Sequence, residues 1–458
     1  MRIEHDLLGD RELPLEAYYG VHTLRALENF PISGVKVSAF PDFVVALAQV
    51  KQASAEANRA LGHLPADISA AIIAACGEIR SGQLHEHFVV DVIQGGAGTS
   101  TNMNANEVIA NRALELLGRA KSDYRYLSPN EHVNLSQSTN DVYPAAVKIA
   151  LIAGIHKLRA AMAVLRAEFA KKSNEFKDLV KIGRTQLQDA VPMTLGQEFL
   201  TYAVMLHEDE ERLAEAAQLL HEINLGATAI GTGINTPPGY AKEVCAQLCA
   251  LTGEPFVTAG NLIEATQDAG AFVQLSGVLK RVAVKLSKVC NDLRLLSSGP
   301  RAGFGEINLP AMQAGSSIMP GKVNPVIPEV VNQIAFEVIG NDVTVTFAAE
   351  GGQMQLNAFE PIIAFSLFKS LLHMERGCLV LAHKCVAGIT ANENRLRDIV
   401  EHSMAIVTAL NPYIGYAAAT QLALEAHHTG KSIRELALAK KLLPADQLET
   451  VLDPRNLI

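Results

Sequence analysis

Apolar residues in the middle of the chain recur at intervals of three and four positions, which is the spacing of one face of an α-helix. The pattern begins near Asp141 and therefore predicts a long helix that starts there and buries a single apolar stripe. The apolar positions of this stripe are Val147, Leu151, Ile155, Leu158, Met162, Leu165 and Phe169.

Further segments repeat this helical spacing. Thr194 and Gln197 form a capping-box pair, which predicts the start of a second helix. The most regular segment runs from about Asn261 to Ser297, a rod of about 55 Å. Two more helices are expected over about Pro328–Phe347 and Pro361–Val386. Rods of this length predict a five-helix bundle, part of whose apolar surface is buried by other copies of the chain.

The flanking regions carry shorter and less regular signals. Before the first long helix, extended signals at 10–14 and 30–37 alternate with helical patches at 43–61 and 68–81. Near the C-terminus the sequence predicts short helices separated by turns. The pattern therefore predicts three domains, at residues 1–138, 139–390 and 391–458.

The composition narrows the class of protein. Hydrophobic residues make up 49% of the chain, aromatic residues only 5%, and Trp is absent, which suits packed helices. The formal net charge is -9 without a basic block, so neither nucleic acid nor a membrane surface is expected as a partner. The six cysteines lack metal-binding spacing, and the N-terminus lacks the apolar run of a signal peptide. We therefore expect a soluble, cytoplasmic protein.

Two glycine-containing segments resemble cofactor-binding motifs, but each lacks residues that the motif requires. Gly315 and Gly321 are separated by five residues, one more than a phosphate loop has, and Val323 replaces its hydroxyl residue. The segment GGAGTST (95–101) lacks the third glycine of a dinucleotide fingerprint. The paired histidines have no second ligand cluster nearby in the sequence. Neither a metal nor a nucleotide is therefore expected.

Four polar segments remain, and pattern alone leaves each with two interpretations. SQSTND (136–141) is either only the N-cap cluster of a helix or also a site for a carboxylate or oxyanion at that helix start. GSSIMPGKVN (315–324) is either a surface connection or a loop that closes over a ligand. GTSTNMN (98–104) and GRTQLQDA (183–190), which contains Arg184, suit anion binding but are also common in loops.

Taken together, these segments resemble the fumarase and aspartase superfamily of lyases over essentially the whole chain. The motif GSSIMPGKVNP (315–325) is highly specific to that superfamily. Three further segments look like the aspartate ammonia-lyases within it: residues 4–30, GRTQLQDAVPMTLGQE (183–198) and VNPVIPEVVNQ (323–333). A fumarase would ordinarily carry His where Gln186 stands.

The resemblance implies a mainly α, three-domain fold whose central five-helix bundle forms the twenty-helix core of a homotetramer. Each active site would combine segments of three subunits. The implied reaction is the reversible deamination of L-aspartate to fumarate and ammonia through an enediolate, without a cofactor. The alternatives are a fumarate hydratase, which expels water from malate, and a structural protein of the kind recruited into eye lenses.

The resemblance also assigns roles to individual residues. Ser316 would be the catalytic base that removes the β-proton of the substrate. Four hydroxyl residues, Thr99, Ser138, Thr139 and Ser317, would surround the carboxylate that becomes the enediolate.

The remaining roles concern the rest of the substrate. Lys322 and Asn324 would contact its α-carboxylate, and Asn140 its amino group. Thr185 and Gln186 would line the pocket.

Overall fold

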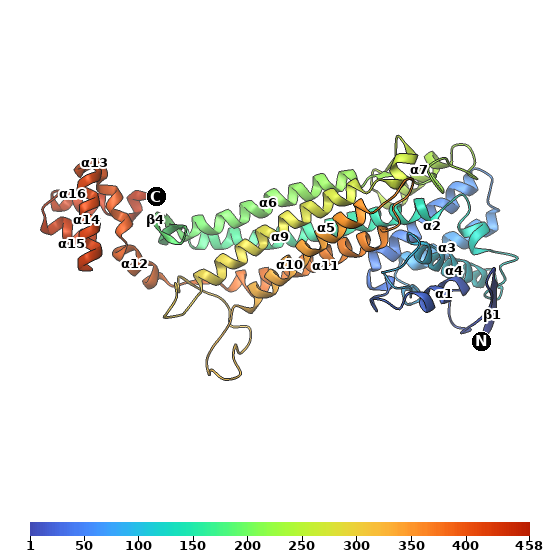
Figure 1. Cartoon of the computed structure of the whole chain (residues 1–458), viewed down its shortest axis with the longest axis horizontal. Helices are drawn as coiled ribbons and strands as arrows, with labels where there is room; N and C mark the ends of the chain where they lie inside the picture. Colours follow the sequence, from blue (N-terminus) through green and yellow to red (C-terminus); the bar gives the residue numbers. More distant parts are fainter. The chain divides into compact units, whose positions relative to one another are not determined.

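The computed structural model describes the backbone of residues 1–458 and every side chain except those of Pro454 and Leu457. The chain forms two compact units, and Figure 1 shows its helices and strands in sequence colours. Unit 1 comprises Met1–Arg159, Glu211–Ala283 and Phe336–Met374; unit 2 comprises Ala160–Glu210, Val284–Ala335 and Glu375–Ile458. The division into domains at residues 138 and 390 stays a prediction.

Five long helices dominate the fold, as the apolar spacing predicts, and each contributes residues to both units. The predicted capping box of the second helix is confirmed, because Thr194 and Gln197 each accept the other's backbone N–H, at 2.9 and 3.0 Å. The long helices are α5 (Thr139–Glu175), α6 (Leu195–Leu219), α9 (Gly270–Leu296), α10 (Val326–Glu350) and α11 (Glu360–Lys384).

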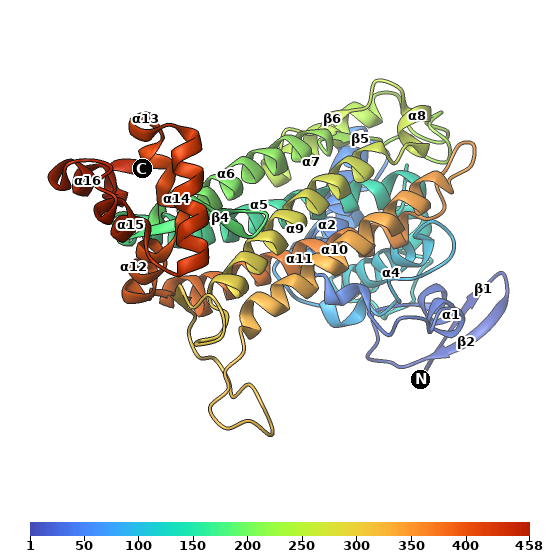
Figure 2. The ribbon, with the colours of Figure 1, turned by 60° about the vertical axis from the view of Figure 1, so that its left-hand side comes forward.

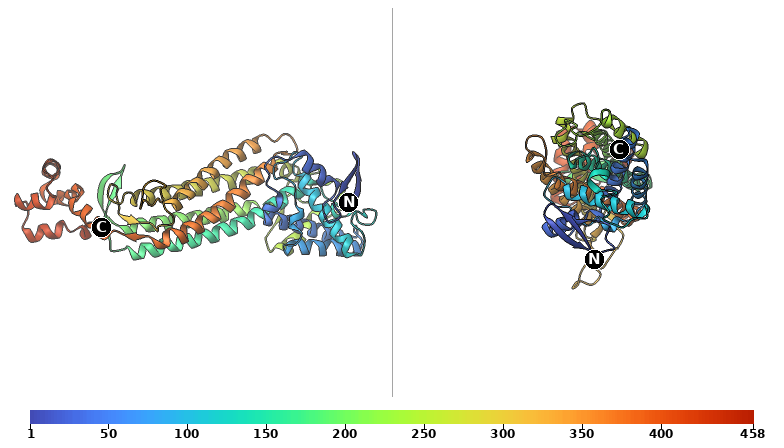
Figure 3. Two further views of the ribbon diagram at one scale, coloured as in Figure 1. Left: turned by 90° about the horizontal axis from the view of Figure 1, so that it is seen from below. Right: turned by 90° about the vertical axis from the view of Figure 1, so that its right-hand side faces the viewer.

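Neighbouring long helices contact each other inside each unit, through hydrogen bonds and through aromatic rings. In unit 1, Asp342 of α10 accepts a hydrogen bond from Ser276 of α9 at 2.8 Å. In unit 2, Asn332 of α10 donates to Ser287 of α9 at 2.9 Å, and the ring of Phe169 in α5 packs against that of Tyr202 in α6. The ribbon views agree that α9 and α10 run beside each other (Figures 2 and 3). The predicted helical bundle is therefore confirmed.

The predicted helix from Asn261 to Ser297 is wrong in one respect, because it is broken near Asp268. Helix α8 (Leu262–Gln267) ends there and α9 begins at Gly270. The Asp268 carboxylate accepts the backbone N–H of Gly270 at 2.9 Å, in competition with the helical hydrogen bonds. The longest helix is α5, with 37 residues.

The rest of unit 1 is also mainly helical. The helical patches predicted at 43–61 and 68–81 are confirmed, but the extended signal at 30–37 is not a strand and contains only an isolated bridge from Lys36 to Asp91. The shorter elements of unit 1 are β1 (Arg2–Asp6), β2 (Gly9–Leu13), α1 (Val21–Asn29), α2 (Pro41–Ala60), α3 (Ala66–Arg80), α4 (Thr99–Leu116), β5 (Glu222–Ile223), α7 (Tyr240–Thr252), β6 (Val257–Thr258) and α8.

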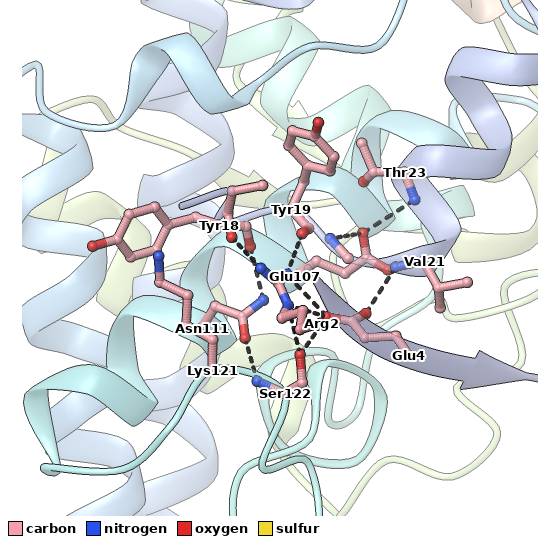
Figure 4. Close-up of polar contacts among 12 residues, drawn as sticks. Arg2, Glu4, Tyr18, Tyr19, Val21, Thr23, Glu107, Asn111, Lys121 and Ser122 are labelled. Carbon is pink, nitrogen blue, oxygen red and sulfur yellow. Dashed lines mark hydrogen bonds and ion pairs between the residues drawn. The ribbon is translucent and has the colours of Figure 1, made fainter. Parts of the chain in front are cut away.

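Two buried carboxylates hold the N-terminal segment in place, and one of them, Glu107, joins it to α4 (Figure 4). Glu107 of α4 accepts the backbone N–H groups of Gly20 and Thr23, at 2.8 and 3.1 Å. Glu4 of β1 accepts the N–H of Val21 at 2.8 Å. Helix α4, which carries the predicted site residue Thr99 at its first position, is therefore joined to the N-terminal segment through Glu107.

Unit 2 adds two small β-pairs and a helical C-terminal region. An apolar cluster that includes Leu410, Leu422, Leu436 and Leu448 forms the core of that region. Among the described residues, no helix has both the length and the apolar content needed to cross a bilayer. The elements are β3 (Val180–Thr185) paired with β4 (Gln188–Thr194), β7 (Ile307–Asn308) paired with β8 (Thr390–Ala391), α12 (Glu393–His402), α13 (Asn411–Ile414), α14 (Tyr416–Thr429), α15 (Ile433–Ala439) and α16 (Ala445–Val451).

Candidate active site

Helix α4 begins in a tight turn that places Thr99 at its first position. Gly98 caps the helix with φ +90, a conformation that side chains rarely adopt. A Cβ atom at Gly98 would lie 2.3 Å from the ring of Tyr143 in α5, so only glycine allows the two helix starts to approach this closely. Thr99 donates its hydroxyl hydrogen to the carbonyl of Gly96 at 2.8 Å.

Helix α5 begins at Thr139, and the buried carboxylate of Asp141 organises its first turn. One Asp141 oxygen accepts the N–H of Ser138 at 3.0 Å. The other oxygen accepts the N–H groups of Gly226 and Thr228, at 3.2 and 2.9 Å. Asp141 therefore fixes the Ser138–Asn140 turn against a second backbone segment.

Asn140 is held by that same segment. Its amide donates to the carbonyl of Ala229 at 2.7 Å, and its own carbonyl accepts from Asn224 at 3.0 Å. The Ser138 hydroxyl oxygen accepts the N–H of Asn140 at 3.3 Å, as the N-cap interpretation predicts.

A network of amides joins the starts of α4 and α5. Asn102 of α4 donates to the Thr139 hydroxyl oxygen and to the side-chain oxygen of Asn134, both at 3.2 Å. The Asn134 oxygen also accepts from the ammonium of Lys51 at 2.9 Å, and Lys51 donates to Gln137 at 2.9 Å as well. The structure thus brings Thr99 together with Ser138, Thr139 and Asn140. We call these four residues the helix-start site.

Two buried charges lie beneath the helix-start site. Burial raises the pKa of the Asp141 carboxyl to about 6, although its three backbone donors favour the charged form. Burial lowers the pKa of the Lys51 ammonium to about 7, against the attraction of Asp141. Lys51 was not identified from the sequence, and Asp141 only as the start of the long helix, because a lone lysine or aspartate in a helical pattern carries no signal of its depth.

In unit 2, Thr185 and Gln186 lie at the tip of the β3–β4 hairpin. Gln186 and Leu187 form its two-residue turn, with φ values of 54 and 63. Two consecutive residues in the left-handed region define the turn type that fits the twist of a hairpin. Neither residue is glycine, so the turn carries a conformational cost that the surrounding structure must offset.

Arg184, which precedes this turn, is already paired. Its guanidinium forms an ion pair with the buried carboxylate of Glu306 at 2.5 Å and lies 4.3 Å from the centre of the Phe304 ring. The interpretation of Arg184 as an anion-binding group is therefore not supported by its contacts. Glu306 was missed because a single glutamate in a loop resembles any surface residue.

The signature loop, residues 315–324, is closed at its neck. The N–H of Gly315 donates to the carbonyl of Lys322 at 2.7 Å, and the Asn324 amide donates to the carbonyl of Gly315 at 2.7 Å. A Cβ at Gly315 would lie 2.8 Å from both the Asn324 nitrogen and the Lys322 carbonyl. Glycine is therefore required for the neck to close in this way.

Next to the neck of the signature loop, Ser316 receives two backbone donors. Its hydroxyl oxygen accepts the N–H groups of Ile318 and Met319, at 3.1 and 2.8 Å. Both donors would stabilise negative charge on that oxygen. Ser317 and Lys322 are exposed, and Figure 2 shows the loop extending away from the helices between which it lies, α9 and α10.

The two units therefore carry different parts of the predicted site. Unit 1 holds the helix-start site, and unit 2 holds the hairpin turn and the signature loop. Among the described residues, no group of three or more His, Cys, Asp or Glu side chains is placed to hold a metal ion.

Family models and curated relatives match this chain over most or all of its length. A family model described as "Lyase" matches residues 9–340, and one described as "Fumarase C C-terminus" matches residues 406–458. The aspartate ammonia-lyase of Pseudomonas aeruginosa is 59% identical over all of this chain and 97% of its own length. That of Escherichia coli K12 is 54% identical over all of this chain and 96% of its own length.

Solved structures give the same result. The fumarate lyase:delta crystallin from Brucella melitensis, bound to cobalt, superimposes with a TM-score of 0.97 at 55% identity, covering 100% of this chain and 99% of its own. A class II fumarase from Schistosoma mansoni gives a TM-score of 0.94 at 35% identity, covering 100% and 98%. The chain therefore belongs to the fumarase and aspartase superfamily of lyases.

Proposed function

We propose that this protein is an enzyme that reversibly converts L-aspartate to fumarate and ammonia. The observation that carries the proposal is the Ser316 hydroxyl oxygen, which accepts two backbone N–H groups in the family's signature loop. Identity of 59% with an aspartate ammonia-lyase, against 35% with a class II fumarase, favours aspartate over malate as the substrate. Gln186, in place of the histidine expected of a fumarase, agrees with this choice.

The first chemical step is the removal of a proton from the β-carbon. That proton is very weakly acidic, and a serine hydroxyl is a poor base unless its alkoxide is stabilised. The N–H groups of Ile318 and Met319 supply part of that stabilisation to Ser316. Closure of the signature loop over the substrate would exclude water and strengthen these interactions.

The electrons of the broken C–H bond move into the adjacent carboxylate, which becomes a dianionic enediolate. Thr99, Ser138, Thr139 and Ser317 are the hydroxyl groups proposed to receive this charge. When the enediolate collapses, its electrons form the carbon–carbon double bond and ammonia leaves from the α-carbon. The proton that Ser316 took from the β-carbon is then released to solvent.

The other proposed contacts orient the substrate. Lys322 and Asn324 bind the α-carboxylate, Asn140 contacts the amino group, and Thr185 and Gln186 line the pocket. The exposed Lys322 is available for a charge-assisted hydrogen bond to a carboxylate. No cofactor enters any of these steps.

We further propose that the protein is a cytoplasmic homotetramer of three-domain chains, divided at residues 138 and 390, with each active site combining segments of three subunits. Support for assembly comes from apolar side chains of α10 that a monomer leaves in water. Phe336, Val343 and Phe347 are 62%, 52% and 71% exposed. Light scattering of the purified protein tests the oligomeric state, and a stable monomer would refute it.

Two parallel assays test the proposed reaction. Purified protein is incubated with L-aspartate and, separately, with L-malate, and fumarate is followed by its ultraviolet absorbance. We expect fumarate from aspartate with release of an equal amount of ammonia, and little or none from malate. Fumarate from malate alone would identify a fumarate hydratase, and no fumarate from either substrate would favour a structural protein.

A further inference from the structure

A buried ion cluster lies directly behind the hairpin turn of unit 2. The Glu306 carboxylate is fully buried and forms ion pairs with Lys181 at 2.8 Å and with Arg184 at 2.5 Å. Lys181 also donates to Glu198 of α6 at 2.6 Å. Two cations of β3 therefore converge on a single carboxylate that belongs to a distant part of the sequence.

The geometry of β3 is adjusted to permit this convergence. Residues three apart on a flat strand, such as Lys181 and Arg184, point to opposite faces. The pairing of β3 with β4 shifts register between Ile182 and Arg184, an irregularity of the kind that increases local twist. Both long side chains reach Glu306 across this twisted region.

Glu306 is itself fixed through its backbone. Its N–H donates to the carbonyl of Leu296 at 2.9 Å, and its carbonyl accepts the N–H of Asn392 at 2.9 Å. Strand β7 begins at the next residue, and the chain continues from there to Ser316. Glu306 therefore marks the fixed end of the segment that leads into the signature loop.

Arg184 of β3 precedes the hairpin turn as Glu306 precedes the signature loop. It immediately precedes Thr185 and the strained turn at Gln186 and Leu187. Such a turn persists only where its surroundings over-determine it. The ion pair of Arg184 with Glu306, and its stacking on Phe304, supply that restraint at the residue next to the turn.

Stability alone is a poor explanation for this cluster. Buried ion pairs are often no more stabilising than apolar residues of the same volume, because both charges must leave water. What they do impose is geometry, since a misplaced partner leaves an uncompensated buried charge. The cluster is therefore better suited to setting the position of the turn than to strengthening the fold.

We propose that Glu306 and Arg184 are positioning residues, which hold the Thr185–Gln186 turn on the same rigid frame from which the signature loop extends. This inference rests on the proposed function and deepens it. Neither side chain contacts the substrate in this account. Their effect on the reaction passes through Thr185 and Gln186, whose placement would be set by the ion pair.

A double-mutant cycle on the full-length protein tests this. Glu306→Gln, Arg184→Met and the double variant are compared in steady-state kinetics with L-aspartate. We expect each single change to lower kcat/KM by about 10- to 100-fold, the scale of a displaced catalytic geometry. The double variant should be no more than about threefold worse than the worse single variant, because both changes break one interaction.

Two milder variants keep the test informative if Glu306→Gln does not fold. Arg184→Lys retains the charge but loses the planar, stacking guanidinium, and should lower kcat/KM with little change in melting temperature. Glu306→Asp retains the carboxylate and should recover part of the activity lost in Glu306→Gln. The exposed ion pair of Lys440 with Glu425, at 2.8 Å, is the matched control, and its removal should leave kinetics unchanged.

The outcomes separate this inference from the proposed function. A wild-type protein inactive towards aspartate would refute the proposed function itself. An active wild type whose folded Arg184 and Glu306 variants keep normal kcat and KM would overturn the positioning role. Independent losses that multiply in the double variant would also overturn it, because they would show that the two residues do not act as a unit.

Discussion

The helix-start site of unit 1 and the signature loop of unit 2 hold their polar groups by different means. Beneath the helix-start site, the side chain of Asp141 is buried and binds three backbone N–H groups. The signature loop is tied at its neck by Gly315 and Asn324, while Ile318 at its tip is 83% exposed. One region is fixed from within the unit, and the other is tied mainly at its base.

This difference matches the tasks proposed for the two regions. Charge that develops on a carboxylate is stabilised best by donors that are already in place, because they need not reorganise during the reaction. A base that must meet the substrate after it enters requires an element that can open and close. The predictions below test whether the fixed region and the exposed loop differ in this way.

The largest effect is expected in the signature loop, at Ser316. Ser316→Ala removes the hydroxyl of the proposed base and little packing, because its side chain is only half-buried. Turnover of aspartate should fall by at least about a thousandfold while circular dichroism and oligomeric state remain unchanged. Gln313→Ala, an exposed change just before the loop, is the control and should retain wild-type kinetics. Near-normal turnover of Ser316→Ala would remove Ser316 from the role of base.

The next largest effect is expected at the helix-start site. Gly98→Ala places a Cβ 2.3 Å from the Tyr143 ring, so the starts of α4 and α5 must move apart. We expect kcat to fall by about 100-fold and the free energy of unfolding by about 2 kcal/mol or more.

Gly118→Ala is the matched control for Gly98→Ala. Gly118 follows the end of α4 with φ +70, and a Cβ there meets no atom within 4 Å. It therefore reproduces the backbone strain without the contact on Tyr143. Equal kinetic losses in the two variants would mean that strain, and not the approach of the two helix starts, causes the effect.

A smaller effect is expected at Lys322, also in the loop. Lys322→Ala should raise KM for aspartate by about 10-fold or more and change kcat less, since the proposed contact to the α-carboxylate exists before and during reaction. Val323→Ala changes a neighbouring exposed side chain that has no proposed contact, and should leave KM as it is. An unchanged KM for Lys322→Ala would contradict this assignment.

The sequence predicted the long helices from their spacing, and it predicted candidate site residues in both regions only through resemblance, so their roles stay predictions. Apolar spacing located the five long helices, because a buried helical face repeats along the chain. It did not locate the break at Asp268, where a side chain competes with the backbone for one N–H group. Resemblance to a family named Ser316 and Lys322, which lie in one continuous motif.

The supporting residues could not be found in the same way. Lys51, Asp141 and Glu306 act through burial and through partners that are remote in sequence. A charged residue in a sequence is ordinarily solvent-exposed, so nothing in its neighbours indicates that it is buried and paired. Arg184 is an example. The composition of its segment suited anion binding, but the partner of Arg184 is a carboxylate of the protein itself.

A last effect is expected in stability alone and comes from Glu360, a buried carboxyl of unit 1. Burial raises the pKa of Glu360 to about 8, although Lys148 of α5 opposes the shift. Between about pH 4.5 and 8 the folded state therefore keeps a proton on Glu360 that the unfolded chain releases, and the stability contributed by this group falls as pH rises. Glu360→Gln, which cannot ionise, should flatten this dependence.

Urea unfolding followed by circular dichroism at pH 5 and pH 9 measures the difference. Relative to Glu360→Gln, the wild type should lose about 4 kcal/mol between these values, because its carboxyl becomes charged in an apolar setting. Glu425→Gln, a change at an exposed carboxylate, serves as the control and should keep the wild-type dependence. If Glu360→Gln and the wild type lose stability in parallel, the pH sensitivity lies in other groups.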